Sequence, residues 1–142
     1  MVRVMASGVF DIIHTGHISY LQQAKALGDE LIVVVACDET VRKNKHEPIT
    51  PEGMRAKIVE NLKPVDEAII GKGGDIFDTV RKISPDIIVL GFDQTFDENG
   101  LRKGLEEHGL GHIIVTRAAE YAEDLTATRR IIQKIRKLED GT

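Results

Sequence analysis

The chain has 142 residues, 42% of them hydrophobic and 30% charged, and its formal net charge is −4. The length fits one globular domain spanning residues 1–142, and the excess of acidic residues argues against nucleic-acid binding through bulk phosphate attraction. No apolar run reaches the roughly 18 residues that a membrane-spanning helix needs, and the single cysteine, Cys37, excludes an internal disulfide framework. We therefore expect a cytoplasmic protein with neither a nucleic-acid nor a membrane partner.

Apolar runs of strand length, rich in Val and Ile, alternate along the chain with segments of helical periodicity. The predicted strands are residues 2–6, 31–36, 67–70, 86–90 and 112–116. The second and the fourth are almost continuously apolar. This pattern indicates strands that are covered on both faces, as in a parallel sheet.

The segments between the strands have recognisable helix ends. The predicted helices are residues 17–27, 51–62, 75–83, 101–108 and 125–138. Gly28 is placed to end the first helix, and Thr50 is placed to cap the second, with Pro51 as its first residue. Residues 37–49 are predicted to form a long basic loop.

The last predicted helix is amphipathic. Ile131, Ile132, Ile135 and Leu138 share the face that we expect to point inward, and many Arg and Lys residues point outward. The alternation of strands and helices predicts an α/β fold, a single Rossmann-like domain with a five-stranded parallel sheet and helices on both faces. In such sheets, ligands bind beyond the carboxyl ends of the strands.

The most informative motif lies between the first predicted strand and the first predicted helix, at residues 8–17. Gly16 allows the backbone to approach a bulky anion, and His17 falls in the first helical turn, where unpaired N–H groups favour phosphate. His14 and His17 are spaced to contact different oxygens of one polyphosphate. At neutral pH we expect both imidazoles to be partly cationic.

The same residues also admit other interpretations. The two histidines can be structural parts of a strand–helix turn. A metal site would need further ligands, and Cys37 and His46 have no recognisable metal-ligand spacing. The Gly-x-Gly-x-x-Gly pattern of dinucleotide-binding folds is absent, and residues 71–74, Gly-Lys-Gly-Gly, are predicted to form a turn rather than a P-loop.

Residues 8–11 and 14–17 resemble the signature of the cytidylyltransferase-like nucleotidyltransferases. Members of that family join a substrate phosphate to the α-phosphate of a nucleoside triphosphate and release pyrophosphate. The resemblance covers essentially the whole chain, with further similarity in the basic loop, at Arg55, at residues 90–93 and at residues 125–129. It implies a divalent cation, Mg²⁺, bound with the triphosphate rather than in a protein cage, and a homodimer.

The resemblance also implies a role for each matching residue. The implied catalytic residues are His14, His17, Lys43 and Arg55. Lys43, Lys45 and Arg55 are expected to hold the phosphate of the second substrate or the α-phosphate. The implied nucleotide contacts are Gly8, Val9, Phe10, His14, Gly16, His17, Gly91, Asp93, Leu125, Thr126, Thr128 and Arg129.

Several of these residues also have a simple structural explanation. The lysines fit a solvated loop, and Arg55 is spaced to pair with Glu52 or Glu60 on its own helix. Thr126 fits an ordinary helix cap, and Asp93 fits a turn cap.

The resemblance settles the reaction type better than the substrates. Glycerol-phosphate cytidylyltransferases carry Arg-Thr-Glu-Gly-Ile-Ser-Thr where residues 121–127 read Tyr-Ala-Glu-Asp-Leu-Thr-Ala, without the arginine and the glycine. Residues 46–52 and 62–68 are more similar to the archaeal FAD synthases, small members that transfer AMP from ATP to FMN. We therefore expect ATP and FMN as substrates. The alternatives are CTP with glycerol 3-phosphate, ATP with a sugar phosphate, and a non-catalytic nucleotide-binding module.

Overall fold

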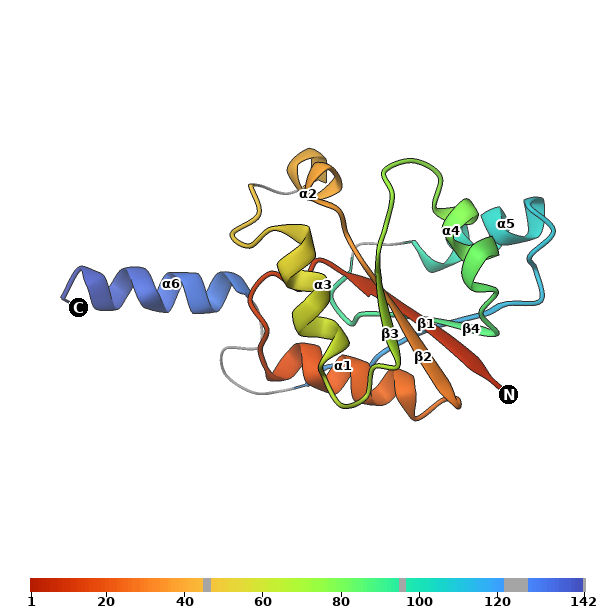
Figure 1. The fold of residues 1–142 in the computed structure, drawn as a ribbon, viewed down its shortest axis with the longest axis horizontal. Coiled ribbons are helices and arrows are strands. Elements are labelled where there is room, and N and C mark those ends of the chain that lie inside the picture. The colour runs from red at the N-terminus through yellow and green to blue at the C-terminus, as the bar shows by residue number, and fades with distance from the viewer. Residues whose placement is uncertain (45–46, 95–96, 122–127, 142) are drawn as a thin grey trace.

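The computed structural model describes residues 1–44, 47–94, 97–121 and 128–141 (Figure 1). The strands in these residues are β1 (Arg3–Gly8), β2 (Glu30–Val35), β3 (Glu67–Ile70), β4 (Ile87–Leu90) and β5 (Ile114–Arg117). They form one parallel sheet in the order β3-β2-β1-β4-β5. The predicted five-stranded parallel sheet is therefore confirmed.

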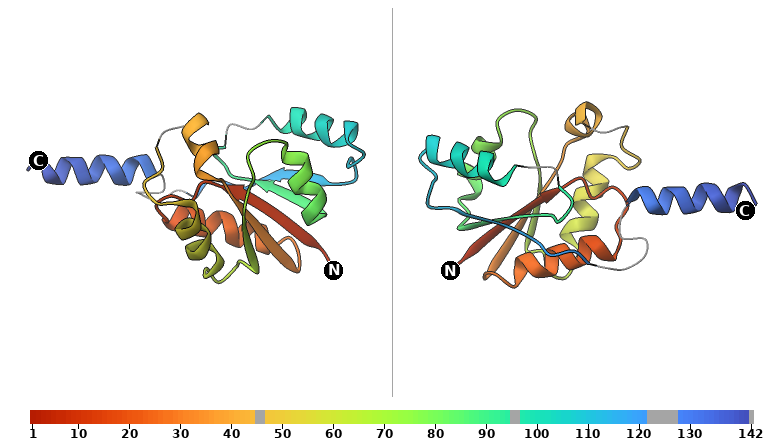
Figure 2. Two further views of the ribbon diagram at one scale, coloured as in Figure 1. Left: turned by 45° about the horizontal axis from the view of Figure 1, so that its top comes forward. Right: turned by 180° about the vertical axis from the view of Figure 1, so that it is seen from behind.

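The helices that the described residues form are α1 (Thr15–Lys25), α2 (Asp38–Asn44), α3 (Glu52–Glu60), α4 (Ile76–Ile83), α5 (Glu98–Glu107) and α6 (Thr128–Glu139). Helices α1 and α3 pack on one face of the sheet, and α4 and α5 pack on the other (Figures 1 and 2). Helices thus cover both faces, as predicted. Within the described residues, no helix is both long enough and apolar enough to cross a membrane.

Successive residues of the central strands contribute their side chains to two separate hydrophobic cores, one on each face of the sheet. In β1, Val4 and Ala6 face α1 and α3, whereas Met5 faces α4 and α5. In β2, five of the six residues are buried, which explains its continuous apolarity. β1 continues to Gly8, beyond its predicted end, because Ser7 and Gly8 still pair with the backbone of β2.

The predicted long loop at residues 37–49 is partly wrong, because α2 occupies its first half. This helix has acidic residues in its first turn and Arg42 and Lys43 in its last, an arrangement that the helix dipole favours. Among the side chains of α2 that the structure describes, only Val41 is buried, with 1% exposure. A short helix with a single apolar anchor shows no periodicity in the sequence, so the pattern could not reveal it.

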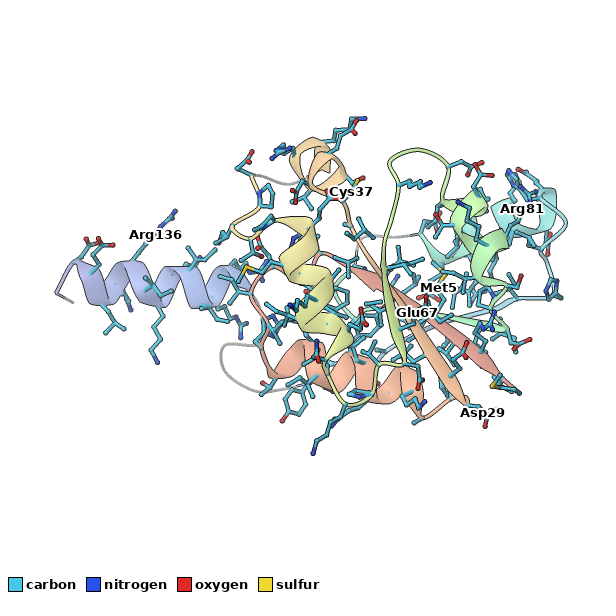
Figure 3. All side chains as sticks on the ribbon, in the orientation of Figure 1. Met5, Asp29, Cys37, Glu67, Arg81 and Arg136 are labelled. Atoms are coloured by element: carbon cyan, nitrogen blue, oxygen red, sulfur yellow. The ribbon has the colours of Figure 1, made fainter. Side chains whose placement is uncertain are left out.

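The last predicted helix exists, but its apolar face is only partly covered: Ile131 and Ile132 are half-buried, and the rest of the face does not point inward. Within the described residues, Ile135 and Leu138 are 55% and 67% exposed. α6 extends away from the rest of the chain, and side chains such as Arg136 project into open space (Figure 3). Its amphipathic pattern therefore reflects a face that the body of this chain covers only in part.

The order of the strands places a topological switch point between β1 and β4. The chain moves from β1 to β2 and β3 on one side, and then to β4 and β5 on the other. The two strands pair only as far as Ala6 and Val89. Beyond that pair the connections diverge, and in open α/β sheets ligands bind at such a point, at the carboxyl ends of the strands.

Candidate functional site

The β1–α1 loop has an unusual backbone at Phe10, which adopts a left-handed conformation with φ of 56°. The Phe10 ring is 3% exposed and lies over Gly8, where an added Cβ would come within 3.0 Å of the ring. A side chain at position 8 would crowd the aromatic ring, so this position favours glycine. A left-handed backbone at a non-glycine residue costs on the order of 1–3 kcal/mol, so it persists only where the surrounding structure enforces it. Such residues are common at functional sites.

The two histidines of the motif cap the helix that follows. His14 is the N-cap residue of α1, and its Nδ1 accepts a hydrogen bond from the Gly16 N–H at 3.1 Å. In return, the Nδ1 of His17 accepts from the His14 N–H at 3.2 Å. The Gly16 N–H is thus already paired, contrary to the expectation that backbone N–H groups of this turn stay open to phosphate.

This capping arrangement fixes the tautomer of both rings. An Nδ1 that accepts a hydrogen bond carries no proton, so the neutral ring holds its proton on Nε2. The rings of His14 and His17 stack with their centroids 3.8 Å apart, a distance at which two imidazolium ions repel each other. Burial lowers the pKa of His14 below its ordinary value of 6.5, although the negative charge of Asp93 opposes that effect. For His14, the expectation of a partly cationic ring is thus replaced by a neutral Nε2–H donor.

We expect His14 of the unliganded protein to titrate below pH 6.5 and to carry its proton on Nε2 at pH 8. Because the folded state favours the neutral ring, the associated stability is present above pH 6.5. It is lost as the pH falls through the lowered pKa. Long-range ¹H–¹⁵N correlation spectra of the imidazoles, recorded across a pH series, measure both properties. A pKa above 6.5, or a proton on Nδ1, would contradict the capping geometry.

Two side chains hold the turn that follows β4: Gln94, which belongs to the turn, and Arg117, which belongs to β5. Gln94 bridges the switch point, because its Oε1 accepts from the Gly91 N–H at 2.7 Å and its Nε2 donates to the Ser7 carbonyl at 2.9 Å. Arg117, at the end of β5, donates from Nη1 to the carbonyls of Gly91 and Gln94, both at 2.8 Å. These bonds make residues 91–94 a rigid edge of the site.

The rigid turn presents two exposed side chains next to the histidine loop. Asp93 is exposed, and its charge acts on His14. Phe92 is 51% exposed and adds an aromatic surface to the same turn. Tyr20 links the two strands at the switch point: its hydroxyl donates to the Val89 carbonyl at 2.6 Å and accepts from the Ser7 N–H at 3.1 Å. Burial raises the pKa of this phenol, so Tyr20 serves as a neutral structural donor.

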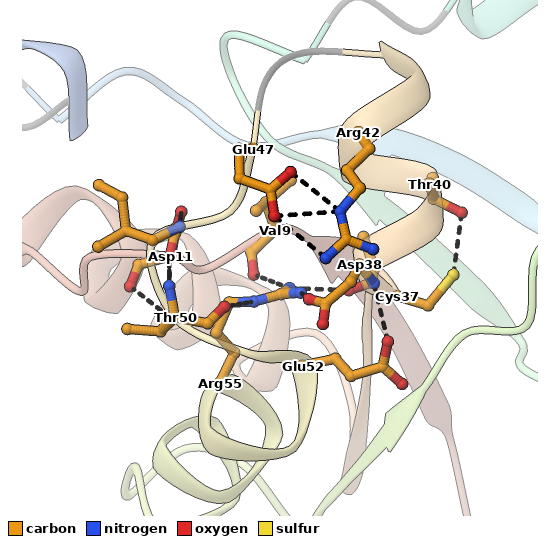
Figure 4. A network of polar contacts seen from close by, with 12 residues as sticks. Val9, Asp11, Cys37, Asp38, Thr40, Arg42, Glu47, Thr50, Glu52 and Arg55 are labelled. Carbon is orange, nitrogen blue, oxygen red and sulfur yellow. Dashed lines mark hydrogen bonds and ion pairs between the residues drawn. The ribbon is translucent and has the colours of Figure 1, made fainter.

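A second polar network ties the loops at this edge of the sheet together (Figure 4). The carboxylate of Asp11 accepts from the Ile49 N–H at 2.8 Å, the Thr50 N–H at 2.9 Å and the Thr50 hydroxyl at 2.7 Å. Burial alone would raise the pKa of Asp11, but these hydrogen bonds and the charge of Arg55 hold it below its ordinary value. Thr50 therefore binds Asp11 instead of capping α3, whose N-cap is Pro51.

The predicted phosphate-binding cations lie in very different surroundings. Arg55 is 0% exposed and pairs with Asp38 at 2.6 Å, so neither the expected open phosphate contact nor the pairing with Glu52 or Glu60 is what the structure shows. Lys43 has a side chain that is 68% exposed and pairs with Glu39 at 3.2 Å across one turn of α2. Of these two, only Lys43 is accessible to a ligand.

The other predicted residues near the C-terminus lie in the first turn of α6 or outside the described residues. The first turn of α6, which contains Thr128 and Arg129, lies beside the β1–α1 loop in all three views (Figures 1 and 2). Lys45, Leu125 and Thr126 lie outside the residues that the structure describes.

Sequence reasoning missed Gln94 and Arg117 as supports of the site. Gln94 lies in the segment that follows β4, and Arg117 is the last residue of β5, so a polar residue at the carboxyl end of a parallel strand was the available signal. In holding the turn, they bind backbone carbonyls and the backbone N–H of Gly91, and such contacts leave no trace in the sequence.

Comparisons of the sequence and of the fold with known proteins identify the family of this chain. The sequence matches the family described as Cytidylyltransferase-like over residues 5–134. It is 52% identical to a protein named FAD synthase from Aciduliprofundum boonei, covering 95% of this chain and 91% of that protein. It is also 52% identical to a FAD synthase from Thermoplasma acidophilum, covering 97% and 96%. A solved structure from Thermoplasma volcanium, described as a lipopolysaccharide core biosynthesis protein, is 50% identical, with a TM-score of 0.83 over 85% of this chain and 98% of that one.

Proposed function

The chain belongs to the cytidylyltransferase-like family and is a nucleotidyltransferase, and we propose that it transfers AMP from ATP to FMN to form FAD and diphosphate. The observation that carries the choice of substrates is the 52% identity, over nearly the full length, to proteins named FAD synthase. A single nucleotidyltransferase domain over residues 1–142 is part of the proposal and agrees with a family match that spans 5–134.

The reaction requires no general base from the protein. The phosphate of FMN is already ionised, so its oxygen can attack the α-phosphate of ATP without a general base, and the bond to diphosphate breaks. Catalysis then depends on holding the two phosphates together and on stabilising the charge that develops at the α-phosphate and on the leaving group. The Nε2–H donors of His14 and His17 fit that task because the capping hydrogen bonds already hold both rings in place when the charge develops.

The remaining contacts surround that centre. We place Lys43 on the acceptor phosphate or the α-phosphate, and the N-terminal turn of α6, with Arg129, on the β- and γ-phosphates. Asp93, on the turn held by Gln94 and Arg117, is positioned to accept hydrogen bonds from hydroxyl groups of the substrates. Phe92 offers an aromatic surface to a planar ring.

A divalent cation, Mg²⁺, belongs to the proposal as a partner of the triphosphate, where it neutralises phosphate charge. Among the described residues, no group of three or more His, Cys, Asp or Glu side chains is arranged to hold a metal ion. The donors at the centre of the site are N–H groups, which bind phosphate oxygens and not a cation. This donor set fits a cation whose ligands are mainly phosphate oxygens and water.

The function is tested with purified protein, Mg²⁺ and matched substrate pairs, and the products are separated by chromatography. FAD and diphosphate formed in equal amounts from ATP and FMN, with no product from CTP and glycerol 3-phosphate, is the expected result. A third reaction with ATP and a sugar 1-phosphate covers the other alternative acceptor that the sequence leaves open. Product in only the second or third reaction would overturn FMN as acceptor. Tight ATP binding without any product would favour a binding module.

We also propose that the protein is a homodimer in which a second copy covers the apolar face of α6. An isolated helix of 12 residues is marginal in water, so its exposed isoleucine and leucine side chains need a partner. α6 carries five basic side chains and one acidic one, while the whole chain has a net charge of −4. The rest of a second copy is therefore acidic and complements the helix.

The variant Leu138→Glu is expected to shift the protein from dimer to monomer, because it places a charge on the apolar face. Light scattering coupled to size exclusion measures the change. Leu27→Glu, the same substitution at another exposed leucine outside α6, is the matched control and is expected to leave the dimer intact. A parent protein that is monomeric at high concentration would rule the dimer out.

A cytoplasmic location completes the proposal. It is supported by the demand of the reaction for ATP and by Cys37, which is a free buried thiol.

A further inference from the structure

Arg55 is a buried cation whose guanidinium is used almost completely within the protein. It is 0% exposed. Its Nε donates to the Thr50 carbonyl at 2.9 Å, and its Nη1 donates to the carbonyls of Val9 at 2.9 Å and Ala36 at 2.7 Å. Its Nη2 donates to the Asp38 carboxylate at 2.6 Å. A guanidinium enclosed in this way reaches a substrate only by giving up these bonds, which are costly to lose when buried.

The acceptors of Arg55 come from three separate connections at the carboxyl edge of the sheet. Val9 belongs to the loop between β1 and α1, which also holds the histidine pair. Ala36 and Asp38 lie at the join of β2 and α2, and Thr50 lies just before α3. One planar group therefore sets the relative positions of three chain segments. The fixed fork of an arginine suits this task, whereas a lysine offers only a single nitrogen.

The contact with Asp38 fixes the start of α2. Asp38 is the first residue of that helix, and its backbone N–H also donates to the carboxylate of Glu52 at 2.8 Å. Val41, one turn later, is buried at 1% exposure. Lys43 lies on the same short helix, with an exposed side chain. The direction in which α2 presents Lys43 is therefore set from α3, through Asp38.

We propose that Arg55 is a positioning residue, which contacts no substrate and instead fixes the spacing between the histidine pair of the β1–α1 loop and Lys43 of α2. The proposal rests on the proposed function, since it takes Lys43 as a phosphate-binding side chain. It assigns to Arg55 a different role from the direct phosphate contact that the family resemblance implies.

The variant Asp38→Asn tests this role, because it keeps the shape of the side chain but removes the charge that holds the guanidinium. Asp38 is 20% exposed in its side chain, so the change is milder than any replacement of the buried arginine. Asp38→Asn, Lys43→Ala and the double variant form a mutant cycle, measured as kcat/KM for FAD formation. Asp66→Asn is the matched control. Its carboxylate accepts from Lys25 and from the Leu31 N–H, at the opposite edge of the sheet.

Asp38→Asn is expected to lower kcat/KM about tenfold in the parent, because a small misplacement of a catalytic group can cost up to about a hundredfold. In the Lys43→Ala background the same change is expected to cost less than about twofold, since the group that it positions is already gone. Asp66→Asn is expected to stay within about twofold of the parent at a temperature where all variants are folded. Independent, multiplicative effects of Asp38→Asn and Lys43→Ala would overturn the proposal.

Hydrogen exchange of the unliganded variants gives a readout that needs no substrate. The amides of α2 are expected to exchange faster in Asp38→Asn than in the parent, while those of β1 and β2 stay unchanged. Unchanged exchange in α2 would also overturn the proposal. Arg55→Lys is a second variant on the other side of the same contact and is expected to give the same pattern. A parent that makes no FAD would defeat the proposed function alone, and the exchange experiment would still decide whether Arg55 positions α2.

Discussion

Replacement of His14 by Asn is expected to lower kcat at least about a hundredfold while the protein stays folded. Asparagine is a good N-cap residue, so its side-chain oxygen can still accept from the Gly16 N–H. What it lacks is the Nε2–H that we place on the phosphates. Loss of one preorganised donor of this kind typically costs about 3–4 kcal/mol in the barrier. Steady-state kinetics with saturating ATP and FMN measure the effect.

Comparison with alanine separates the two roles of the histidine. His14→Ala is expected to lose the same activity and, in addition, about 1 kcal/mol of stability, because the cap of α1 is removed. His17→Ala is expected to lower kcat to a similar degree. His112, an exposed histidine just before β5, provides the control, and His112→Ala is expected to leave kcat within about twofold of the parent. Activity of His14→Asn within about tenfold of the parent would remove the histidine pair from the mechanism.

The second large effect is expected from Asp11→Asn, which should lower the free energy of unfolding by about 2–4 kcal/mol at pH 7. Asp11 is 7% exposed, and both of its oxygens accept hydrogen bonds from Ile49 and Thr50. An asparagine has one oxygen, and its amide group would face one of these N–H donors. A buried donor is then left without a partner, which costs more than the loss of an average hydrogen bond. Urea unfolding followed by circular dichroism measures the change.

The pH dependence of that difference has a defined sign. The pKa of Asp11 is held below its ordinary value of 3.8, so the folded state favours the carboxylate. The stability that Asp11 contributes is therefore present above pH 3.8 and is lost as the pH falls through the lowered pKa. Asp75→Asn is the control, because Asp75 is an exposed N-cap and asparagine caps equally well. Equal urea midpoints for Asp11→Asn and the parent at pH 7 would contradict the role of the network.

The sequence could predict the sheet because burial on two faces leaves a strong local signal. β2 and β4 are short, apolar and rich in Ile and Val, so they are readable without knowledge of their neighbours. The histidine motif was readable for a similar reason, since its residues are consecutive and lie at the end of a strand. In these places, local chain properties and the final fold favour the same structure.

Other features depend on contacts between segments that are distant in the chain. Thr50 and Pro51 have the pattern of a helix cap, yet Asp11, 39 residues earlier, takes the hydroxyl of Thr50. Arg55 has the spacing of an intrahelical ion pair, but the ends of β1 and β2 meet at its guanidinium and enclose it. α6 has the pattern of a packed helix, and only the tertiary structure shows that its apolar face is left partly exposed.

The sequence by itself determined the α/β class, the parallel sheet and the histidine pair at its carboxyl edge, because each rests on neighbouring residues or on a simple period. The tertiary structure decided which nitrogen of each histidine is left to act as a donor, and that Arg55 is enclosed while Lys43 stays accessible. It also decided that Gln94 and Arg117 support the turn beside the histidine loop. The histidine contacts are made within one turn and depend on its exact backbone geometry. The contacts of Arg55, Gln94 and Arg117 reach backbone groups of remote segments, and only folding brings those groups within reach.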